Sequence, residues 1–184
     1  MIHSVRDRPK PAVASGWLGW GTIWGVRRVV VVGAGGAGKS IFAARLGEAT
    51  GLPVVELDRI FWRRGLLPIS HDEWAAMQEQ LVAQPDWILD GDLGPYDFLE
   101  PRLRTADTIV VLDFSPWRCA WRAMLRSREK LDFWRWLWTW RRKHRPPLLA
   151  SIAAQSSEAE VFVLRNPREL ERLLATLASG TAPT

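Results

Sequence analysis

The chain has 184 residues, of which 47% are hydrophobic and 24% charged, a composition typical of one soluble globular domain. A net charge of +5 and a pI near 10.1 favour acidic ligands such as phosphates and also permit nucleic acid. The one cysteine, Cys119, excludes an internal disulfide and a cysteine-rich zinc site. Because no apolar run reaches the roughly 18 residues that span a bilayer, we expect a cytoplasmic protein without a membrane partner.

The first 26 residues do not have the pattern of a folded core. Arg6–Pro11 is charged and broken by prolines, and Gly16–Gly25 is apolar but rich in glycine. This stretch lacks the apolar core and the cleavage site of a signal peptide. We expect a disordered extension over 1–26, one domain over 27–178 and a tail over 179–184. The alternative is that the extension docks on the domain through Trp17, Trp20 and Trp24.

A glycine-rich loop follows the first predicted strand, Val29–Val32. The spacing Gly33-xxxx-Gly38-Lys39-Ser40 is the Walker A pattern, in which backbone N–H groups surround a phosphate at the start of a helix. Lys39 then neutralises the β- and γ-phosphates, and the Ser40 hydroxyl binds Mg²⁺. We predict that ATP binds here, with GTP left open. The predicted binding residues are Gly33, Gly35, Gly36, Ala37, Gly38, Lys39, Ser40 and Ile41.

The rest of the chain alternates between strand and helix patterns. Further strands are predicted at 53–58, 87–90, 108–113 and 159–164, with a loop at 61–65. Helices are predicted at 40–50, 70–84, from 115 onward and at 167–178. Gly51, Ser70 and Ser115 are predicted to cap three of these helix ends. A basic segment over 127–145 should end at Pro146 and Pro147. Such alternation with short connections predicts an α/β fold with a parallel sheet. Ligands of these sheets bind outside the carboxyl ends of the strands.

Three of the predicted strands end in aspartate, which places three carboxylates at that edge of the sheet. Asp90 is the first candidate to hold Mg²⁺ through water, and Asp113, after an apolar strand, is the runner-up. Asp58 is a candidate to orient an acceptor hydroxyl or to act as a base. The alternative for each of them is a capping or turn role.

Two arginines follow the strand that ends at Asp113. Arg122 and Arg126 are four residues apart, so they share a helix face and could clamp phosphates together. The alternative is a solvated basic face that also includes Arg118. The region 115–147 as a whole has the basic character of a lid over a phosphate site.

Tryptophans and cations alternate between Phe133 and Arg145. This pattern permits stacking on single-stranded nucleic acid. We favour ordinary helix packing, with arginine and lysine stems lying over the rings. Some of the rings could also form an oligomer contact.

Several motifs together resemble the nucleoside-monophosphate-kinase branch of P-loop proteins. The P-loop lies near the domain start, Trp87–Gly91 resembles the Asp-Gly motif of adenylate kinases, and the apolar strand Ile109–Asp113 precedes an arginine-bearing helix. Over about 27–177 the chain is more closely similar to the bacterial "topology modulation protein" family. That similarity rests on the following motifs: Val54–Asp58, Phe61-Trp62, Glu73-Trp74, Trp87–Gly91, Arg141–Pro146 and Val163–Glu169.

The resemblance implies a three-layer P-loop fold with five parallel strands in the order 2-3-1-4-5. It also implies transfer of the γ-phosphoryl group of ATP, with Mg²⁺, to a nucleotide or another small acceptor. The predicted catalytic residues are Lys39, Asp58, Asp90, Arg122 and Arg126, and Arg165 is predicted to contact the adenine or the lid. The Phe-Pro-Arg of adenylate kinases is absent. An alternative is therefore a nucleotide-binding regulator without transfer activity that contacts nucleic acid through the Trp-rich segment.

Overall fold

The computed structural model describes residues 26–63, 67–93, 97–126, 131–156 and 158–179. Five parallel strands form the central sheet in the order β2-β5-β1-β6-β7. Their bounds are Arg28–Gly33 (β1), Val54–Glu56 (β2), Trp87–Asp90 (β5), Thr108–Leu112 (β6) and Glu160–Leu164 (β7). When the five strands of this sheet are numbered 1 to 5 along the sequence, their order across the sheet is 2-3-1-4-5. This order confirms the predicted fold.

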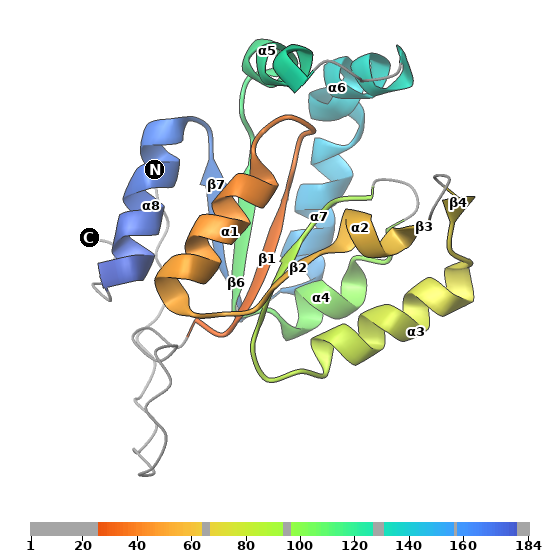
Figure 1. The fold of residues 1–184 in the computed structure, drawn as a ribbon, viewed down its shortest axis with the longest axis vertical. Coiled ribbons are helices and arrows are strands. Elements are labelled where there is room, and N and C mark those ends of the chain that lie inside the picture. Colours follow the sequence, from red (N-terminus) through yellow and green to blue (C-terminus); the bar gives the residue numbers. More distant parts are fainter. Residues whose placement is uncertain (1–25, 64–66, 94–96, 127–130, 157, 180–184) are drawn as a thin grey trace.

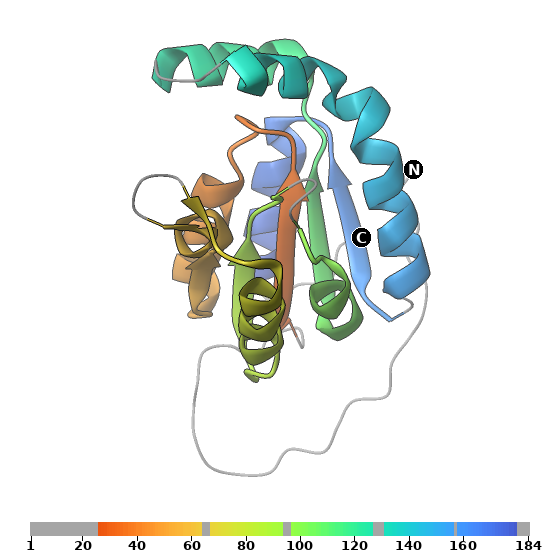
Figure 2. The same cartoon turned by 90° about the vertical axis from the view of Figure 1, so that its right-hand side faces the viewer.

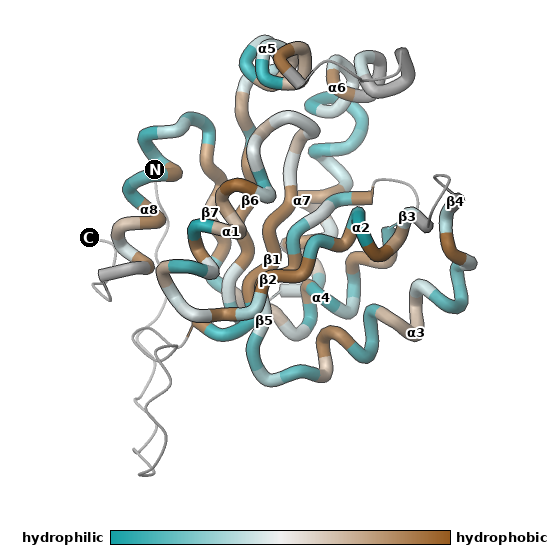
Figure 3. The backbone as a smooth tube through the Cα atoms, in the orientation of Figure 1, coloured by the Kyte–Doolittle hydropathy of each residue, from teal (hydrophilic) through white to brown (hydrophobic). Residues whose placement is uncertain are grey.

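The P-loop strand β1 lies at the centre of this sheet. It pairs with β5 on one side, where Val31 aligns with Asp90, and with β6 on the other, where Val32 aligns with Val111. The four valines of β1 are fully buried, as expected for a strand covered by helices on both faces. The hydrophobic segments accordingly gather in the central strands (Figure 3).

Helices cover both faces of the sheet (Figure 1). On one face lie α1 (Lys39–Thr50) and α8 (Pro167–Ser179), which contact each other. On the other lie α3 (His71–Val82), α4 (Glu100–Thr105) and α7 (Arg145–Gln155). The helices α5 (Pro116–Arg126) and α6 (Leu131–Lys143) lie across the end of the sheet above the P-loop (Figure 2).

Local sequence signals account for several helix ends. Ser70 caps α3 because its Oγ accepts a hydrogen bond from the Glu73 N–H at 3.3 Å. The Ser115 hydroxyl accepts one from the Arg118 N–H at 3.4 Å at the start of α5. Gly51 ends α1 with φ of 74°, a left-handed conformation that suits glycine. These three predicted caps are confirmed.

Other predictions about the elements were wrong. The strand predicted over 53–58 ends at Glu56, and Asp58 lies in the short helix α2 (Leu57–Phe61). The segment predicted as a loop after it contains β3 (Trp62–Arg63), which pairs with β4 (Leu67–Pro68). Neither α4 nor α7 was predicted. Pro146 and Pro147 lie in the first turn of α7, where the missing N–H groups cost no helical hydrogen bond.

The predicted N-terminal extension, except for Val26, and the tail after Ser179 lie outside the described residues. Within the described ranges, no helix combines the length and the hydrophobicity required to cross a bilayer.

Candidate active site

The P-loop joins β1 to α1 at the carboxyl edge of the sheet. Gly33, Gly36 and Gly38 have φ of 139°, 75° and 96°, values that residues with a Cβ rarely adopt. A turn is closed within the loop by a hydrogen bond from the Ala37 N–H to the Ala34 carbonyl at 3.2 Å. Because α1 begins at Lys39, directly after the loop, its first N–H groups point toward the loop mouth, as anion binding requires.

Helix α5 packs directly against this loop. A Cβ on Gly36 would lie 2.6 Å from the Cys119 carbonyl oxygen, and one on Gly38 would lie 3.0 Å from the Arg122 guanidinium. The side chain of Cys119 is itself fully buried. Gly36 is therefore required both by its backbone conformation and by the close approach of the α5 backbone, whereas Gly38 is required by its backbone conformation.

We expect Gly36→Ala to weaken both the fold and the binding of Mg·ATP. The new methyl group would collide with the Cys119 carbonyl, and alanine would be strained at φ of 75°. A cost of about 1–3 kcal/mol in unfolding free energy is typical of such strain. Thermal unfolding and calorimetric titration with Mg·ATP would measure the two effects. Wild-type values for both would contradict the assigned loop geometry.

Three predicted residues meet at the loop mouth. The Lys39 ammonium donates hydrogen bonds to the carbonyls of Gly33 at 2.9 Å and Ala34 at 3.3 Å. The Ser40 hydroxyl lies close to the Asp90 carboxylate, which β5 brings beside the P-loop strand. The structure thus places Lys39, Ser40 and Asp90 together, as their predicted roles require.

Asp90 is only 3% exposed, and its Oδ1 has no hydrogen-bond partner among the described residues. Burial raises the pKa of this carboxyl, while the Ser40 hydroxyl and the Lys39 charge oppose the rise. A buried acceptor without a partner beside a serine hydroxyl fits a hydrated Mg²⁺, which binds few protein groups besides substrate phosphates. No group of three histidine, cysteine or acidic residues suited to a metal occurs in the described ranges.

Asp58 lies in the first turn of α2. Although the residue is exposed as a whole, loss of water around the carboxylate raises its pKa. The Lys39 charge opposes this shift, whereas Asp92 and Asp97 add to it by repulsion. A carboxylate with a raised pKa close to Lys39 is suited to accept a proton from a hydroxyl.

Of the two predicted arginines on α5, Arg122 reaches the P-loop. Its Nη1 donates a hydrogen bond to the Ala37 carbonyl at 3.3 Å, from a half-buried position. Arg126 is the last residue of α5, and its side chain lies outside the described part. Ile41, in the first turn of α1, is 58% exposed next to the loop.

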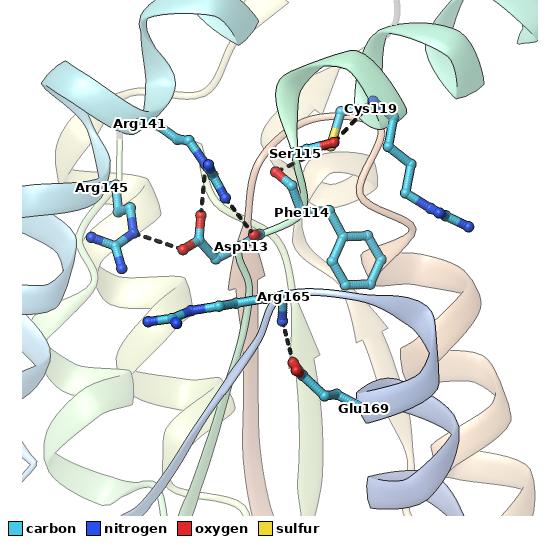
Figure 4. A network of polar contacts seen from close by, with 9 residues as sticks. Asp113, Phe114, Ser115, Cys119, Arg141, Arg145, Arg165 and Glu169 are labelled. Carbon is cyan, nitrogen blue, oxygen red and sulfur yellow. Dashed lines mark hydrogen bonds and ion pairs between the residues drawn. The ribbon is translucent and has the colours of Figure 1, made fainter. Parts of the chain in front are cut away.

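Asp113 follows β6 as predicted, but both oxygens of its carboxylate already accept hydrogen bonds from arginines (Figure 4). Its Oδ1 accepts a hydrogen bond from Arg141 Nε at 3.2 Å, and its Oδ2 accepts one from Arg145 Nε at 2.9 Å. Arg141 Nη2 also donates to the Asp113 carbonyl at 3.1 Å. With both oxygens paired, Asp113 ties α6 and α7 to the sheet, and these contacts favour Asp90 as the carboxylate near Mg²⁺.

Arg165 lies just after β7 at the same edge of the sheet (Figure 4). Its backbone N–H donates to Glu169 Oε2 at 2.6 Å, which fixes the turn into α8. The Arg165 side chain is exposed. The contact with the adenine or the lid that the resemblance implies for it stays a prediction.

Sequence reasoning missed a buried ion pair beside the turn that follows β5. Arg102 on α4 is fully buried and pairs through Nη2 with Asp97 Oδ1. Its Nη1 donates to the Gly91 carbonyl at 3.1 Å, and Asp97 Oδ2 accepts from the Leu93 N–H at 3.3 Å. The pair therefore supports the turn that follows Asp90. No spacing in the sequence signals it, because the two residues become buried only when α4 packs.

A cavity of about 510 Å³ opens at the other end of the sheet, where β1 and β6 begin. It is lined by charged side chains that already have partners. Asp107 accepts hydrogen bonds from the N–H groups of Arg27 and Arg28, and Arg104 Nε donates to Gln155 at 3.0 Å. Burial raises the pKa of Asp107, while those backbone hydrogen bonds oppose the rise. We place the functional site at the P-loop, where the predicted residues converge.

Neither family models nor curated proteins match the chain. Several solved structures, in contrast, match the chain in fold. A gluconokinase from Sinorhizobium meliloti 1021 is 20% identical, with 85% of this chain and 92% of that chain covered and a TM-score of 0.55. A shikimate kinase from Acinetobacter baumannii, in complex with shikimate, is 17% identical over 83% and 91%, with a TM-score of 0.58. A deoxyadenosine kinase from M. mycoides with bound dCTP is 13% identical over 83% and 99%, with a TM-score of 0.50.

These neighbours resemble the chain in overall fold rather than in sequence. At identities of 13–20% they establish the fold alone. The narrower resemblance to topology modulation proteins stays a prediction. The chain has the five-stranded α/β fold of P-loop kinases.

Proposed function

We propose that this chain is an ATP-dependent P-loop kinase that transfers the γ-phosphoryl group to a nucleotide or another small acceptor. The observation that carries the proposal is the convergence of Lys39, the Ser40–Asp90 pair and Arg122 on one phosphate-sized loop. Phosphoryl transfer requires charge neutralisation and an acceptor held in line, and each of these groups serves one of those needs. The proposal includes a cytoplasmic location and keeps membership in the topology modulation family as its narrower form.

The donor side is formed by the loop and α5. Backbone N–H groups of the loop and the Lys39 ammonium would hold the β- and γ-phosphates. Arg122, which lies against Ala37, is placed to approach the same phosphates from above. Mg²⁺, when bound by Ser40 and through water by Asp90, supplies positive charge that offsets the charge developing on the phosphates.

The acceptor side is formed by α2 and the turn after β5. Asp58 would orient the acceptor hydroxyl and take its proton as the oxygen bonds to the γ-phosphorus. The bond between the γ-phosphorus and its bridging oxygen breaks, and the electron pair leaves with the nucleoside diphosphate. The buried Arg102–Asp97 pair keeps the Gly91 turn in place while this happens.

The proposal is tested by incubating the purified chain with Mg²⁺ and γ-labelled ATP or GTP against a panel of acceptors. The panel contains nucleoside monophosphates, sugars, sugar acids and other small alcohols. Label transfer to one acceptor, lost in Asp90→Asn, is the expected result. Nucleotide binding without transfer to any acceptor would favour the nucleotide-binding regulator. DNA binding that persists in Lys39→Ala but falls after changes at Arg141, Arg142 and Lys143 would favour the nucleic-acid reading.

We expect the pH dependence of transfer to report the ionisation of Asp58. A base works only when ionised, so kcat/KM should rise about tenfold per pH unit below its pKa and then level off. Because that pKa lies above the ordinary aspartate value, the rising limb should extend to a higher pH than an unperturbed carboxyl allows.

This pH dependence of kcat/KM is measured by pH–rate profiles of wild type and of Asp58→Asn. The variant should lose the limb that belongs to Asp58 and keep its affinity for Mg·ATP. An unchanged profile in the variant would exclude Asp58 as the base.

A further inference from the structure

The outer surface of α5 is apolar, although this helix already buries its opposite side. Trp117, Trp121 and Leu125 are four residues apart and therefore form one stripe along the helix. They are 74%, 61% and 68% exposed, and Met124 beside them is 52% exposed. The buried residues Cys119 and Ala123 lie on the other side, toward the P-loop and the sheet.

The neighbouring helix α6 extends this apolar surface. Trp138 packs edge-on against Trp117, with ring centroids 4.5 Å apart, and still remains 43% exposed. We call this set the α5 patch: Trp117, Trp121, Met124, Leu125 and Trp138. It exposes on the order of 500 Å² of side chain, as much as the largest patch of a typical monomer, where such patches usually have a function.

Positive charge surrounds the patch. Arg118 follows Trp117, and Arg142 lies one turn beyond Trp138 on α6, both with exposed side chains. Residues 116–145 hold ten of the chain's 25 lysines and arginines but only two of its 20 acidic residues, so the rest of the chain is net acidic. Helices α5 and α6, which carry Trp117, Trp121, Trp138, Arg118 and Arg142, lie at one end of the molecule (Figure 2).

From this combination we propose that α5 and α6 bind the surface of an anionic phospholipid membrane. A helix that presents tryptophan and leucine on one face, flanked by arginine, has the composition of helices that lie in the interfacial plane. The apolar side chains would enter the boundary between headgroups and acyl chains, and Arg118 and Arg142 would meet the headgroup phosphates. Because the P-loop lies directly beneath α5, the nucleotide site would face the membrane-bound end of the protein.

Two other binding partners, a second copy of the chain and single-stranded nucleic acid, fit the α5 patch less well. A second copy would bring two strongly cationic ends together, and the patch is smaller than the ~800 Å² per partner of a standard interface. Single-stranded nucleic acid would stack on the tryptophans but gains little from Met124 and Leu125. The expectation of no membrane partner came only from the lack of a spanning segment, and binding to a membrane surface does not require one.

The test is co-sedimentation of the purified full chain with vesicles of phosphatidylglycerol and, separately, of phosphatidylcholine. We expect partition into the phosphatidylglycerol vesicles to exceed partition into phosphatidylcholine vesicles by at least tenfold and to fall with added salt. The triple variant Trp117→Ser, Trp121→Ser, Leu125→Ser should lose at least tenfold of this binding. Arg118→Glu together with Arg142→Glu should weaken it as well.

A matched control is Val54→Ser with Val161→Ser, which removes two exposed apolar side chains elsewhere and should leave vesicle binding unchanged. All three sets of variants should bind Mg·ATP like wild type, since none of the changed residues belongs to the P-loop. Absence of binding to phosphatidylglycerol, or full binding by the triple variant, would overturn the proposal. So would a patch-dependent dimer in light scattering, or patch-dependent binding of an oligonucleotide in place of vesicles.

Discussion

Replacing Lys39 with alanine is expected to lower kcat/KM for phosphoryl transfer by a factor of about 10³ or more. The Lys39 ammonium lies at the loop mouth, 2.9 Å from the Gly33 carbonyl, where the β- and γ-phosphates would approach. Its removal takes a full positive charge from a partly desolvated site at which negative charge moves during the reaction. The change also removes its attraction for Asp58 and Asp90, so the pKa of each carboxyl should rise further.

Steady-state kinetics and calorimetric titration with Mg·ATP measure the effect of Lys39→Ala. Lys143→Ala is the matched control, because it removes the same charge from an exposed position on α6. The control should retain wild-type turnover, while Lys39→Arg should recover little, since a planar guanidinium does not replace the compact ammonium. Wild-type affinity and turnover in Lys39→Ala would refute the assignment of the nucleotide site.

The largest effect on stability is expected from Asp97→Ala. The Arg102 guanidinium has no exposed surface, and Asp97 is the carboxylate that pairs with it. Losing one partner of a buried pair leaves an uncompensated charge and costs about 3–5 kcal/mol. Because domains of this size are typically stable by about 5–15 kcal/mol, much of the molecule would unfold at moderate temperature.

Denaturant unfolding of the single and double variants measures how much the interaction between Asp97 and Arg102 contributes to the free energy of unfolding, apart from their contacts with other residues. Asp97→Leu combined with Arg102→Met removes both charges and should recover much of the stability lost in either single variant. Glu171→Ala is the control, since it breaks the exposed pair with Arg45 and should cost less than about 1 kcal/mol. A loss in Asp97→Ala no larger than in this control would show that the buried pair carries little energy.

The double variant Asp97→Leu, Arg102→Met also shows whether the buried pair affects catalysis in a protein that still folds. If the pair positions the Gly91 turn, the folded double variant should have a raised KM for the acceptor and an unchanged affinity for Mg·ATP. Unchanged kinetics in a folded double variant would limit the role of Arg102 and Asp97 to packing.

The sequence by itself determined the class of the fold and the position of the glycine-rich loop in it. The sequence predicted strands at 87–90 and 108–113, and the structure places these two strands on either side of β1. The P-loop was predictable because its function depends on consecutive residues, whose glycines and Lys39 act through local backbone geometry. The caps at Ser70, Gly51 and Ser115 are local in the same sense.

Only the tertiary structure decided which groups from distant segments meet. Asp113 had the same sequence pattern as Asp90, and the difference between them arises from Arg141 and Arg145, 28 and 32 residues away. The Arg102–Asp97 pair becomes buried through the packing of α4, and Arg122 reaches Ala37 from a helix 85 residues further along the chain. Likewise, the sequence predicted ordinary helix packing for the Trp-rich segment without showing which rings are buried. The structure buries Leu137 and Trp140 and leaves Trp138 exposed. Local patterns fix what a segment can form, whereas charge pairing and burial depend on which segments the fold brings together.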